Sequence, residues 1–297
     1  MTARSRDTRN HDTGVHRAFM ADRHGIIARH PAVFAADWGM RATATAILIG
    51  AVVLYGVGLV ALEITPGLFA GGLWRLIDIA GLMLPPEVGS WDRFWLYLSA
   101  LGQTLSIAFL GTLLAAVLAF PFGFLAAKNI VPNWLVHLLA RRTLDSIRSV
   151  DTLIWALIWI NVVGLGPFAG ALAIMSADFG AFGKLMSEAI ETADRKASEG
   201  VSAAGGMRIH AVRFGVLPQV LPIIASQILY YFESNVRSAT IIGIVGAGGI
   251  GLHLSEQIRV LEWQQASFLI LMVLITVAAI DSISQRLRAS IIGARAR

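Results

Sequence analysis

The stretch EGVSAAGGMRIHAVRFGVLP, residues 199–218, is a polar and basic segment that lies between two long apolar segments. Asp194, just before it, predicts the start of a short helix, because an aspartate side chain accepts hydrogen bonds from unpaired backbone N–H groups. Gly205 and Gly206 predict the end of that helix, since glycine adopts the left-handed backbone conformation at little cost. Pro218 fits the first turn of the next helix, where its missing N–H is not needed. We therefore expect a helix, a stop and a second helix; the same signals also fit an ordinary loop between two apolar helices.

The composition is that of an integral membrane protein. Of the 297 residues, 56% are hydrophobic and only 14% are charged. Soluble domains carry about 25% charged residues, and a water-soluble core of this size does not need so much apolar surface. The chain has no cysteine, which excludes disulfides and cysteine-ligated metal centres. The expected fold class is an all-α integral membrane protein.

Six apolar segments predict about six transmembrane helices. A helix crosses about 30 Å of hydrocarbon with about 20 residues, at 1.5 Å per residue. The predicted spans are residues 42–64, 101–127, 152–164, 168–186, 217–243 and 266–280. Residues 133–148 also predict a helix, but it is too charged to cross and should lie at the inner interface.

The segments between the spans complete the predicted division of the chain. Residues 1–41 are a basic tail without the pattern of a signal peptide. Residues 65–99 are expected outside, with a short surface helix near 70–83, and residues 252–263 are expected to form an outer loop. Residues 100–290 form the predicted core, with the polar loop 191–217 inside it, and residues 291–297 are a second tail.

The distribution of Lys and Arg predicts the orientation. With both termini inside, the inner segments hold nineteen basic residues and the outer segments hold three. Inner loops of membrane proteins carry the excess of Lys and Arg. The two tails and the loop 191–217 are therefore expected in the cytoplasm, and residues 65–99 are expected in the periplasm or outside the cell.

No pattern for catalysis is present, and no catalytic or metal-ligating residue is predicted. The sequence G-x-x-x-x-G-K-[ST] does not occur, so the chain has no P-loop for ATP. Four glycines follow the fifth predicted span: Gly246, Gly248, Gly249 and Gly251. Three of them fit a dinucleotide-binding spacing, but that motif needs a preceding strand, and here an apolar helix precedes it. Close packing or a flexible outer gate is the better interpretation, and a simple bend stays an alternative.

Charged residues inside predicted spans are the main candidates for function. Glu233 and Arg237 lie in the fifth span, where each ionised group costs about 2.5–3.5 kcal/mol near the bilayer centre. At positions i and i+4 they share a helix face and can pair, either as a neutralising structural pair or along a water-filled path. The other candidate path residues are polar: Gln103, Thr104, Asn235 and Ser238, with Asp178 of the fourth span as a further partner.

The loop also resembles a known family motif. The pattern E-A-A-x3-G-x9-I-x-L-P of ABC-importer permeases is matched by Glu199, Gly205, Leu217 and Pro218. Gly200 and Val201 replace the two alanines, as in the E-G-[IV] variant of phosphonate permeases, and Gly215 replaces the isoleucine. The similarity to phosphonate permeases continues in GLGPFAGALA at 164–173, KLMSEAIE at 184–191, LPQVLP at 217–222, YFESNVRSATIIGIVGAGGIG at 231–251 and SQRLR at 284–288.

This resemblance implies a MetI-like permease fold in the bacterial inner membrane. It implies import of phosphonate, or of phosphate or phosphite, through a path shared with a second permease subunit, identical or not. Two cytoplasmic ATPase subunits would bind the ATP and Mg²⁺, and an extracytoplasmic substrate-binding protein would deliver the solute; no cofactor in this chain and no nucleic acid are expected. The residues implied in coupling to the ATPase are Glu199, Gly200, Ala203, Gly205, Arg208, Leu217 and Pro218.

Three alternatives remain at this point. The same kind of importer could carry another small solute, such as methionine. The chain could instead work without ATP, as a channel or a secondary transporter, or it could be a membrane-embedded enzyme.

Overall fold

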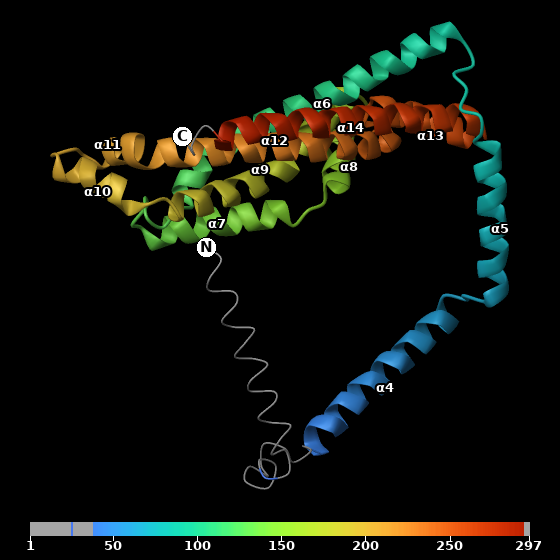
Figure 1. The fold of residues 1–297 in the computed structure, drawn as a ribbon, viewed down its shortest axis with the longest axis horizontal. Helices are drawn as coiled ribbons and strands as arrows, with labels where there is room; N and C mark the ends of the chain where they lie inside the picture. The colour runs from blue at the N-terminus through green and yellow to red at the C-terminus, as the bar shows by residue number, and fades with distance from the viewer. Residues whose placement is uncertain (1–24, 26–37, 294–297) are drawn as a thin grey trace. The chain divides into compact units, whose positions relative to one another are not determined.

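The computed structural model describes residue 25 and residues 38–293, and every regular element in that part of the chain is helical (Figure 1). The elements, with η marking π-helical turns, are α4 (Trp38–Ala61), α5 (Pro66–Leu82), α6 (Trp91–Leu125), α7 (Trp134–Arg148), α8 (Thr152–Val163), α9 (Pro167–Glu191), α10 (Arg195–Ala203), α11 (Arg208–His210), η1 (Ala211–Val216), α12 (Leu217–Ile242), η2 (Gly243–Ala247), α13 (Ile250–Arg259) and α14 (Trp263–Gly293). The all-α fold class is confirmed. Most of the predicted tail 1–41, and residues 294–297 of the other tail, lie outside the described residues.

Five helical stretches among the described residues are long and apolar enough to cross a membrane. They are Arg41–Ala61, Trp91–Leu125, Pro167–Glu191, Arg208–Ala247 and Trp263–Ser290. The stretch from Arg208 to Ala247 has 40 residues. At 1.5 Å per residue it is about 60 Å long, twice the roughly 30 Å of hydrocarbon, so its ends extend beyond the apolar layer.

The third predicted span has a different form from a straight crossing helix. α8 has 12 residues, which is about 18 Å and too short to cross alone. It follows α7 at an angle of 87°, and the two together pass as one broken span or a re-entrant segment. By length and composition, the described residues therefore hold five candidate spans, or six when this bent pair counts as one.

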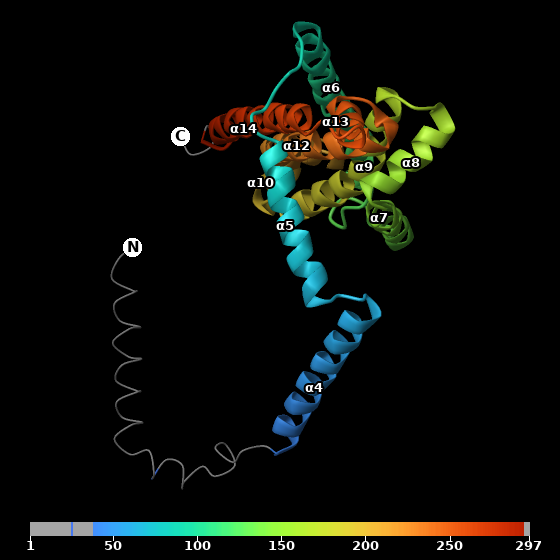
Figure 2. The same ribbon diagram turned by 90° about the vertical axis from the view of Figure 1, so that its right-hand side faces the viewer.

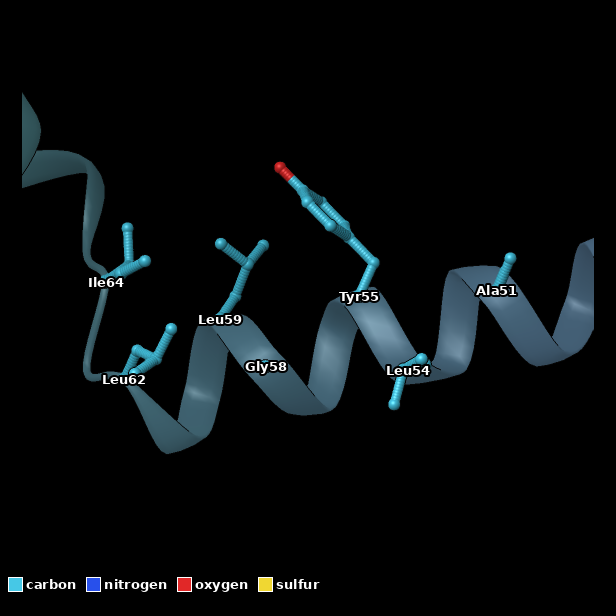
Figure 3. A pocket seen from close by; sticks show the side chains of 7 residues that line it. All are labelled: Ala51, Leu54, Tyr55, Gly58, Leu59, Leu62 and Ile64. Atoms are coloured by element: carbon cyan, nitrogen blue, oxygen red, sulfur yellow. The ribbon is translucent and has the colours of Figure 1, made fainter. Parts of the chain in front are cut away.

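Two compact units divide the chain, residues 1–76 and residues 77–297. In the first unit, none of the apolar window of α4 is buried. Figure 3 shows Tyr55, Leu59 and Ile64 projecting to the same side around an open apolar surface, with Gly58 between them. Such a helix is suited to contact with lipid or with another helix.

The second unit is a helical bundle with α9 at its centre. α9 packs against α6, α7, α8 and α12, and α12 packs against α6 and α14. Figure 2 shows these helices gathered side by side in a view along the bundle. In α9, 61% of the most apolar window is buried, which is the largest share among the spans. α9 is therefore the scaffold on which the other helices are arranged.

Glycine lets the central helices approach closely. A Cβ atom at Gly111 of α6 would lie 2.7 Å from the Cβ of Ile174 on α9. A Cβ atom at Gly180 of α9 would lie 2.5 Å from the carbonyl oxygen of Leu144 on α7. Small residues at helix contacts are the usual means of close packing in membranes, where the hydrophobic effect between helices is absent.

Three boundaries differ from the sequence-based expectations. α6 starts at Trp91 instead of residue 101, because the Ser90 side chain caps it by accepting a hydrogen bond from the N–H of Arg93 at 3.3 Å. The helix of the fifth span is continuous from Arg208, nine residues before its predicted start. The predicted loop 252–263 is wrong, since most of it is the helix α13.

Candidate functional site

The helix, stop and helix predicted for residues 194–218 are present. The Asp194 side chain accepts a hydrogen bond from the N–H of Lys196 at 3.0 Å and caps α10, as expected. α10 ends at Ala203, and Gly205 has a φ of +85°, in the region that favours glycine. Pro218 is the second residue of α12, as expected, but α12 continues directly from η1, so the helical stretch itself begins earlier, at Arg208.

α10 crosses η1 at very short range. A Cβ atom at Gly215 of η1 would lie 2.8 Å from both the Cα and the backbone nitrogen of Ser198 on α10. No side chain fits between the two backbones, so the glycine at this position lets α10 lie directly on η1. This contact gives a physical reason for the glycine at the position where the general permease motif has isoleucine.

The residues expected to couple to the ATPase lie on an open surface. No residue of α10 is buried, and Glu199, Gly200, Ala203 and Gly205 are all exposed. Within the described residues, Glu199 makes no side-chain hydrogen bond or ion pair. Arg208 and Pro218 are exposed and Leu217 is half-buried. Three large apolar side chains beside this segment are also exposed: Met207 at 69%, Ile209 at 71% and Phe214 at 61%.

A groove of about 860 Å³ lies between this segment and the linker from α6 to α7. Lys128, Arg195 and Arg208 line it, together with the single acid Glu199. An exposed short helix, flanked by apolar side chains and a basic groove, is a surface suited to contact with a protein that offers apolar and acidic groups.

Two side chains at the base of α10 were not predicted from the sequence. Glu191, the last residue of α9, accepts a hydrogen bond from the N–H of Lys128 at 2.9 Å and one from Arg141 at 3.2 Å. Gln219 of α12 bonds to the backbone of Asp194. Both contacts join segments far apart in the sequence, and no local spacing pattern signals them.

The predicted pair of Glu233 and Arg237 is wrong. Glu233 accepts a hydrogen bond from Arg288 of α14 at 2.9 Å, and Arg237 lies 3.7 Å from Asp281 of the same helix. The two α12 residues share a face, as expected from their spacing, but each is neutralised by α14 and not by the other. Ser238, nearby, is half-buried.

Asn235 points away from these charges, into the centre of the bundle. Its side-chain nitrogen donates to the hydroxyl of Thr112 on α6 at 2.8 Å and to the carboxylate of Asp178 on α9. All three residues are buried, with 5%, 1% and 7% exposure respectively. Asp178 was expected as a further partner of Glu233 and Arg237, and this expectation is wrong, because its carboxylate bonds to Asn235 instead. The four predicted path residues on α12 therefore do not line one common face in this chain.

Gln103 and Thr104 hold the glycine-rich turn. The Gln103 side-chain oxygen accepts from the N–H of Gly249 at 2.8 Å, and the Thr104 hydroxyl accepts from the N–H of Ile250 at 2.8 Å. These two bonds cap the start of α13, which explains why a helix follows the glycines. Gln103 is also exposed, whereas Thr104 is fully buried.

The four glycines of the candidate gate make close contacts. A Cβ atom at Gly249 would lie 2.4 Å from the Thr104 hydroxyl, and one at Gly251 would lie 1.9 Å from the carbonyl oxygen of Thr240. Gly246 and Gly248 have positive φ values of 103° and 81°. These contacts support the close-packing interpretation of the glycines.

Residues 119–292 match the sequence pattern of the family described as binding-protein-dependent transport system inner membrane component. The chain belongs to this family, whose members are multi-pass permease subunits of ABC importers in the inner membrane. The transport class and the membrane location predicted from the sequence are confirmed.

Relatives and a solved structure agree with this assignment. HtxC of Stutzerimonas stutzeri, named for a phosphite transport system, is 39% identical over 217 residues, covering 73% of this chain and 76% of HtxC. PtxC of the same organism, a phosphite transport system permease protein, is 36% identical over 257 residues, covering 86% of this chain and 91% of PtxC. The fold is similar to that of a chain from the inward-facing MetNI methionine ABC transporter, with a TM-score of 0.61 at 19% identity over 68% of this chain and 99% of that one.

Proposed function

We propose that this chain forms part of the translocation path of an ABC importer for phosphorus oxyanions and is driven by a cytoplasmic ATPase. The substrate class is supported by the two phosphite-system relatives and by the segments that resemble phosphonate permeases. Phosphite, phosphonate and phosphate share a tetrahedral phosphorus with several acceptor oxygens, so one path can serve all three. Methionine transport is the alternative from the fold, but a likeness at 19% identity supports the fold alone.

The observation that carries this proposal is the exposed α10 with its neighbouring residues. Glu199 and Gly205 match the motif of ABC permeases, and the structure leaves the whole helix unburied. α10 is too polar to face lipid, and its exposed side chains, with the apolar Met207, Ile209 and Phe214 beside them, suit contact with another protein. We propose that Glu199, Gly200, Ala203, Gly205 and Arg208 contact the ATPase, and that Leu217 and Pro218 join the contact to α12.

We propose that the energy for transport comes from partner subunits that hydrolyse ATP. No P-loop sequence occurs in these 297 residues, so ATP and Mg²⁺ would bind to partner subunits. We propose a complex of two permease subunits, two ATPase subunits and an extracytoplasmic binding protein. The long helical stretch from Arg208 to Ala247 extends beyond the hydrocarbon layer, which suits a contact with a soluble partner.

The position of basic residues supports the proposed orientation. Lys128, Arg195 and Arg208 line the groove at the α10 end of the bundle. At the opposite end, where Figure 1 shows α13, the basic residues of the described chain are fewer, with Arg259 ending that helix. We propose that the α10 end faces the cytoplasm and that both termini lie there, with 65–99 outside and 100–290 as the permease core.

The path itself is proposed to run along faces that a second permease subunit completes. Glu233 and Arg237 lie at the contact of α12 with α14, and each has a partner, so this pair of ion pairs stabilises the contact. We propose that Ser238, Asn235, Gln103 and Thr104 act next to the path by fixing the positions of α12 and of the glycine turn.

Purification and transport together test this function. The tagged chain is extracted from its native membrane in mild detergent, and the chains that co-purify are identified. The complex is then reconstituted in liposomes with ATP inside, and uptake of labelled phosphite, methylphosphonate, phosphate and methionine is measured with and without the binding protein. We expect ATP-dependent uptake of at least one phosphorus oxyanion and none of methionine. Uptake of methionine alone would overturn the substrate class, and uptake without ATP would overturn the importer.

A matched pair of variants tests the coupling surface in the same liposomes. Glu199→Arg reverses the charge on the exposed face of α10, whereas Glu256→Arg reverses an exposed charge on α13 at the other end. We expect Glu199→Arg to lose uptake and association with the ATPase, and Glu256→Arg to keep the association. Equal association of both variants would remove α10 from the ATPase contact.

A further inference from the structure

Gln219, in the first turns of α12, makes an unusual set of hydrogen bonds. Its side-chain oxygen accepts from the N–H of Asp194 at 3.0 Å. Its side-chain nitrogen donates to the carbonyl oxygen of Asp194 at 3.1 Å and to the carbonyl oxygen of Gly215 at 2.7 Å. One carboxamide therefore bonds both backbone groups of a single residue that lies 25 positions earlier in the chain.

These hydrogen bonds join the starts of two helices. Asp194 is the cap residue at which α10 begins, and Gln219 belongs to the helix that leaves the same segment. Only a primary amide offers a donor and an acceptor side by side, so glutamine suits this arrangement and neither glutamate nor methionine can reproduce it. The bonds hold the start of α10 against the start of α12.

α10 is then attached to the bundle at two separate points. The first is the close crossing at Gly215, where the backbone of Ser198 lies directly on η1. The second is the pair of hydrogen bonds between the Gln219 side chain and the backbone of Asp194, which we call the bracket. A short helix with one attachment can pivot about it, whereas a helix with two attachments can turn only together with the element that holds it.

We propose that Gln219 is a positioning residue that makes α10 and α12 move as one body, so that motion imposed on α10 reaches the centre of the bundle. This inference rests on the proposed function, in which an ATPase moves α10. α12 carries Asn235, which is bonded to α6 and α9, so α12 is the element through which a displacement spreads. Gln219 touches no solute in this scheme and acts only through the helix it holds.

The central variant is Gln219→Met, which keeps the length of the side chain and removes all three hydrogen bonds. Gln219→Glu keeps the acceptor but faces two carbonyl oxygens with a carboxylate. The matched control is Gln285→Met on α14, where the side chain is exposed and makes no hydrogen bond within the described residues. In the reconstituted complex, uptake and ATP hydrolysis are measured together. We expect Gln219→Met to keep assembly and ATP hydrolysis but to move roughly threefold to tenfold less solute per ATP, the effect of losing net hydrogen bonding.

Gln219→Glu should lose at least as much, and Gln285→Met should match the wild type. Unchanged solute per ATP in Gln219→Met would overturn the inference. A parallel loss of assembly, hydrolysis and uptake would also overturn it, because that result describes a merely structural role.

A distance measurement separates this inference from the proposed function. The chain has no cysteine, so Ala203→Cys on α10 and Leu221→Cys on α12, both at exposed positions, can carry spin labels. In the purified permease we expect a narrow distance distribution in the wild-type background and a broad one with Gln219→Met. Equal widths would refute the bracket, whatever the transport data show. A broadened distribution, together with no ATP-dependent uptake by the unlabelled wild-type complex, would refute the proposed function and leave the bracket standing.

Discussion

Adding one methyl group at Gly215 should separate α10 from η1. The Cβ atom would meet the Cα and the nitrogen of Ser198 at 2.8 Å and its Cβ at 3.1 Å. Backbone atoms cannot rotate out of the way as a side chain does, so the two segments must move apart. Extra methyl groups in a closely packed contact cost about 1–3 kcal/mol.

The same segment offers a matched control, because Gly200 of α10 has nothing within 4 Å of the position its Cβ would take. Replacing glycine by alanine inside a helix stabilises it by about 0.5–1 kcal/mol. Gly215→Ala and Gly200→Ala share this gain to a first approximation. The difference between their free energies of unfolding therefore reports the contact between α10 and η1. We expect Gly215→Ala to be less stable than Gly200→Ala by about 1–3 kcal/mol.

Two measurements check this difference. Thermal unfolding of the detergent-solubilised chain reports stability, and titration with the purified ATPase reports affinity. If the ATPase binds α10 only when α10 lies on η1, a cost of about 1–3 kcal/mol for that arrangement lowers the affinity of the chain for the ATPase by about 5- to 150-fold. Equal unfolding temperatures for the two variants, together with an ATPase affinity of Gly215→Ala equal to that of the wild type, would refute the close crossing. Gly215→Ile, which restores the residue of the general permease motif, should be worse than Gly215→Ala.

Other contacts give sharp expectations. Asn235→Leu should destabilise the bundle by about 1–3 kcal/mol, because it leaves the buried Asp178 carboxylate without its donor, and denaturation in detergent checks this. Gly249→Ala should lower uptake by altering the glycine turn, since the added Cβ would lie 2.4 Å from a threonine hydroxyl; crosslinking of the turn to α6 would show the displacement, and unchanged crosslinking would contradict it. Glu233→Gln should reduce stability in the presence of Arg288 and much less in an Arg288→Met background, so a double-mutant cycle with additive effects would rule out the ion pair.

The local parts of the α10 segment could be predicted because their causes are local. Asp194 caps a helix through a bond to an N–H two residues later, and Gly205 ends it through its own φ angle. Both causes lie within a few residues of their effect, and the identity of the residue is enough to indicate them. The apolar spans are predictable for a similar reason, since the bilayer imposes their length and composition.

The partners of the charged residues could not be predicted because they lie far away in the sequence. Glu233 and Arg237 are neighbours on one helix face, and the spacing rule indicates that they are able to pair. It does not reveal that α14 brings Arg288 and Asp281 to the same face. A partner within one turn has to compete with partners that the tertiary fold supplies, and here the tertiary partners are the ones observed.

The glycine turn shows contacts of two candidate path residues that the polar pattern alone does not reveal. Gln103 and Thr104 were expected beside the path because they are polar residues in an apolar span. Their acceptor atoms meet the N–H groups at the start of α13, and this capping turns the expected loop into a helix. A polar residue in a membrane helix must satisfy its hydrogen bonds, and an uncapped helix start next to it offers the donors.

The stretch from Arg208 to Ala247 connects all these features. Near one end it is held to α10 by Gly215 and Gln219, in its middle it is bonded to α6 and α9 through Asn235, and at the other end it enters the glycine turn. Both ends contain a π-helical turn, where the backbone ladder is locally altered, and such turns occur often at functional positions. A helix between two such turns can pass a rotation from one end to the other, although Pro222 removes one backbone hydrogen bond inside it. The side chains of Gln103 and Thr104 hold the glycine turn, and its glycines leave no room for added atoms, so a displacement that starts at α10 and reaches this turn has to move α6 and α13 with it.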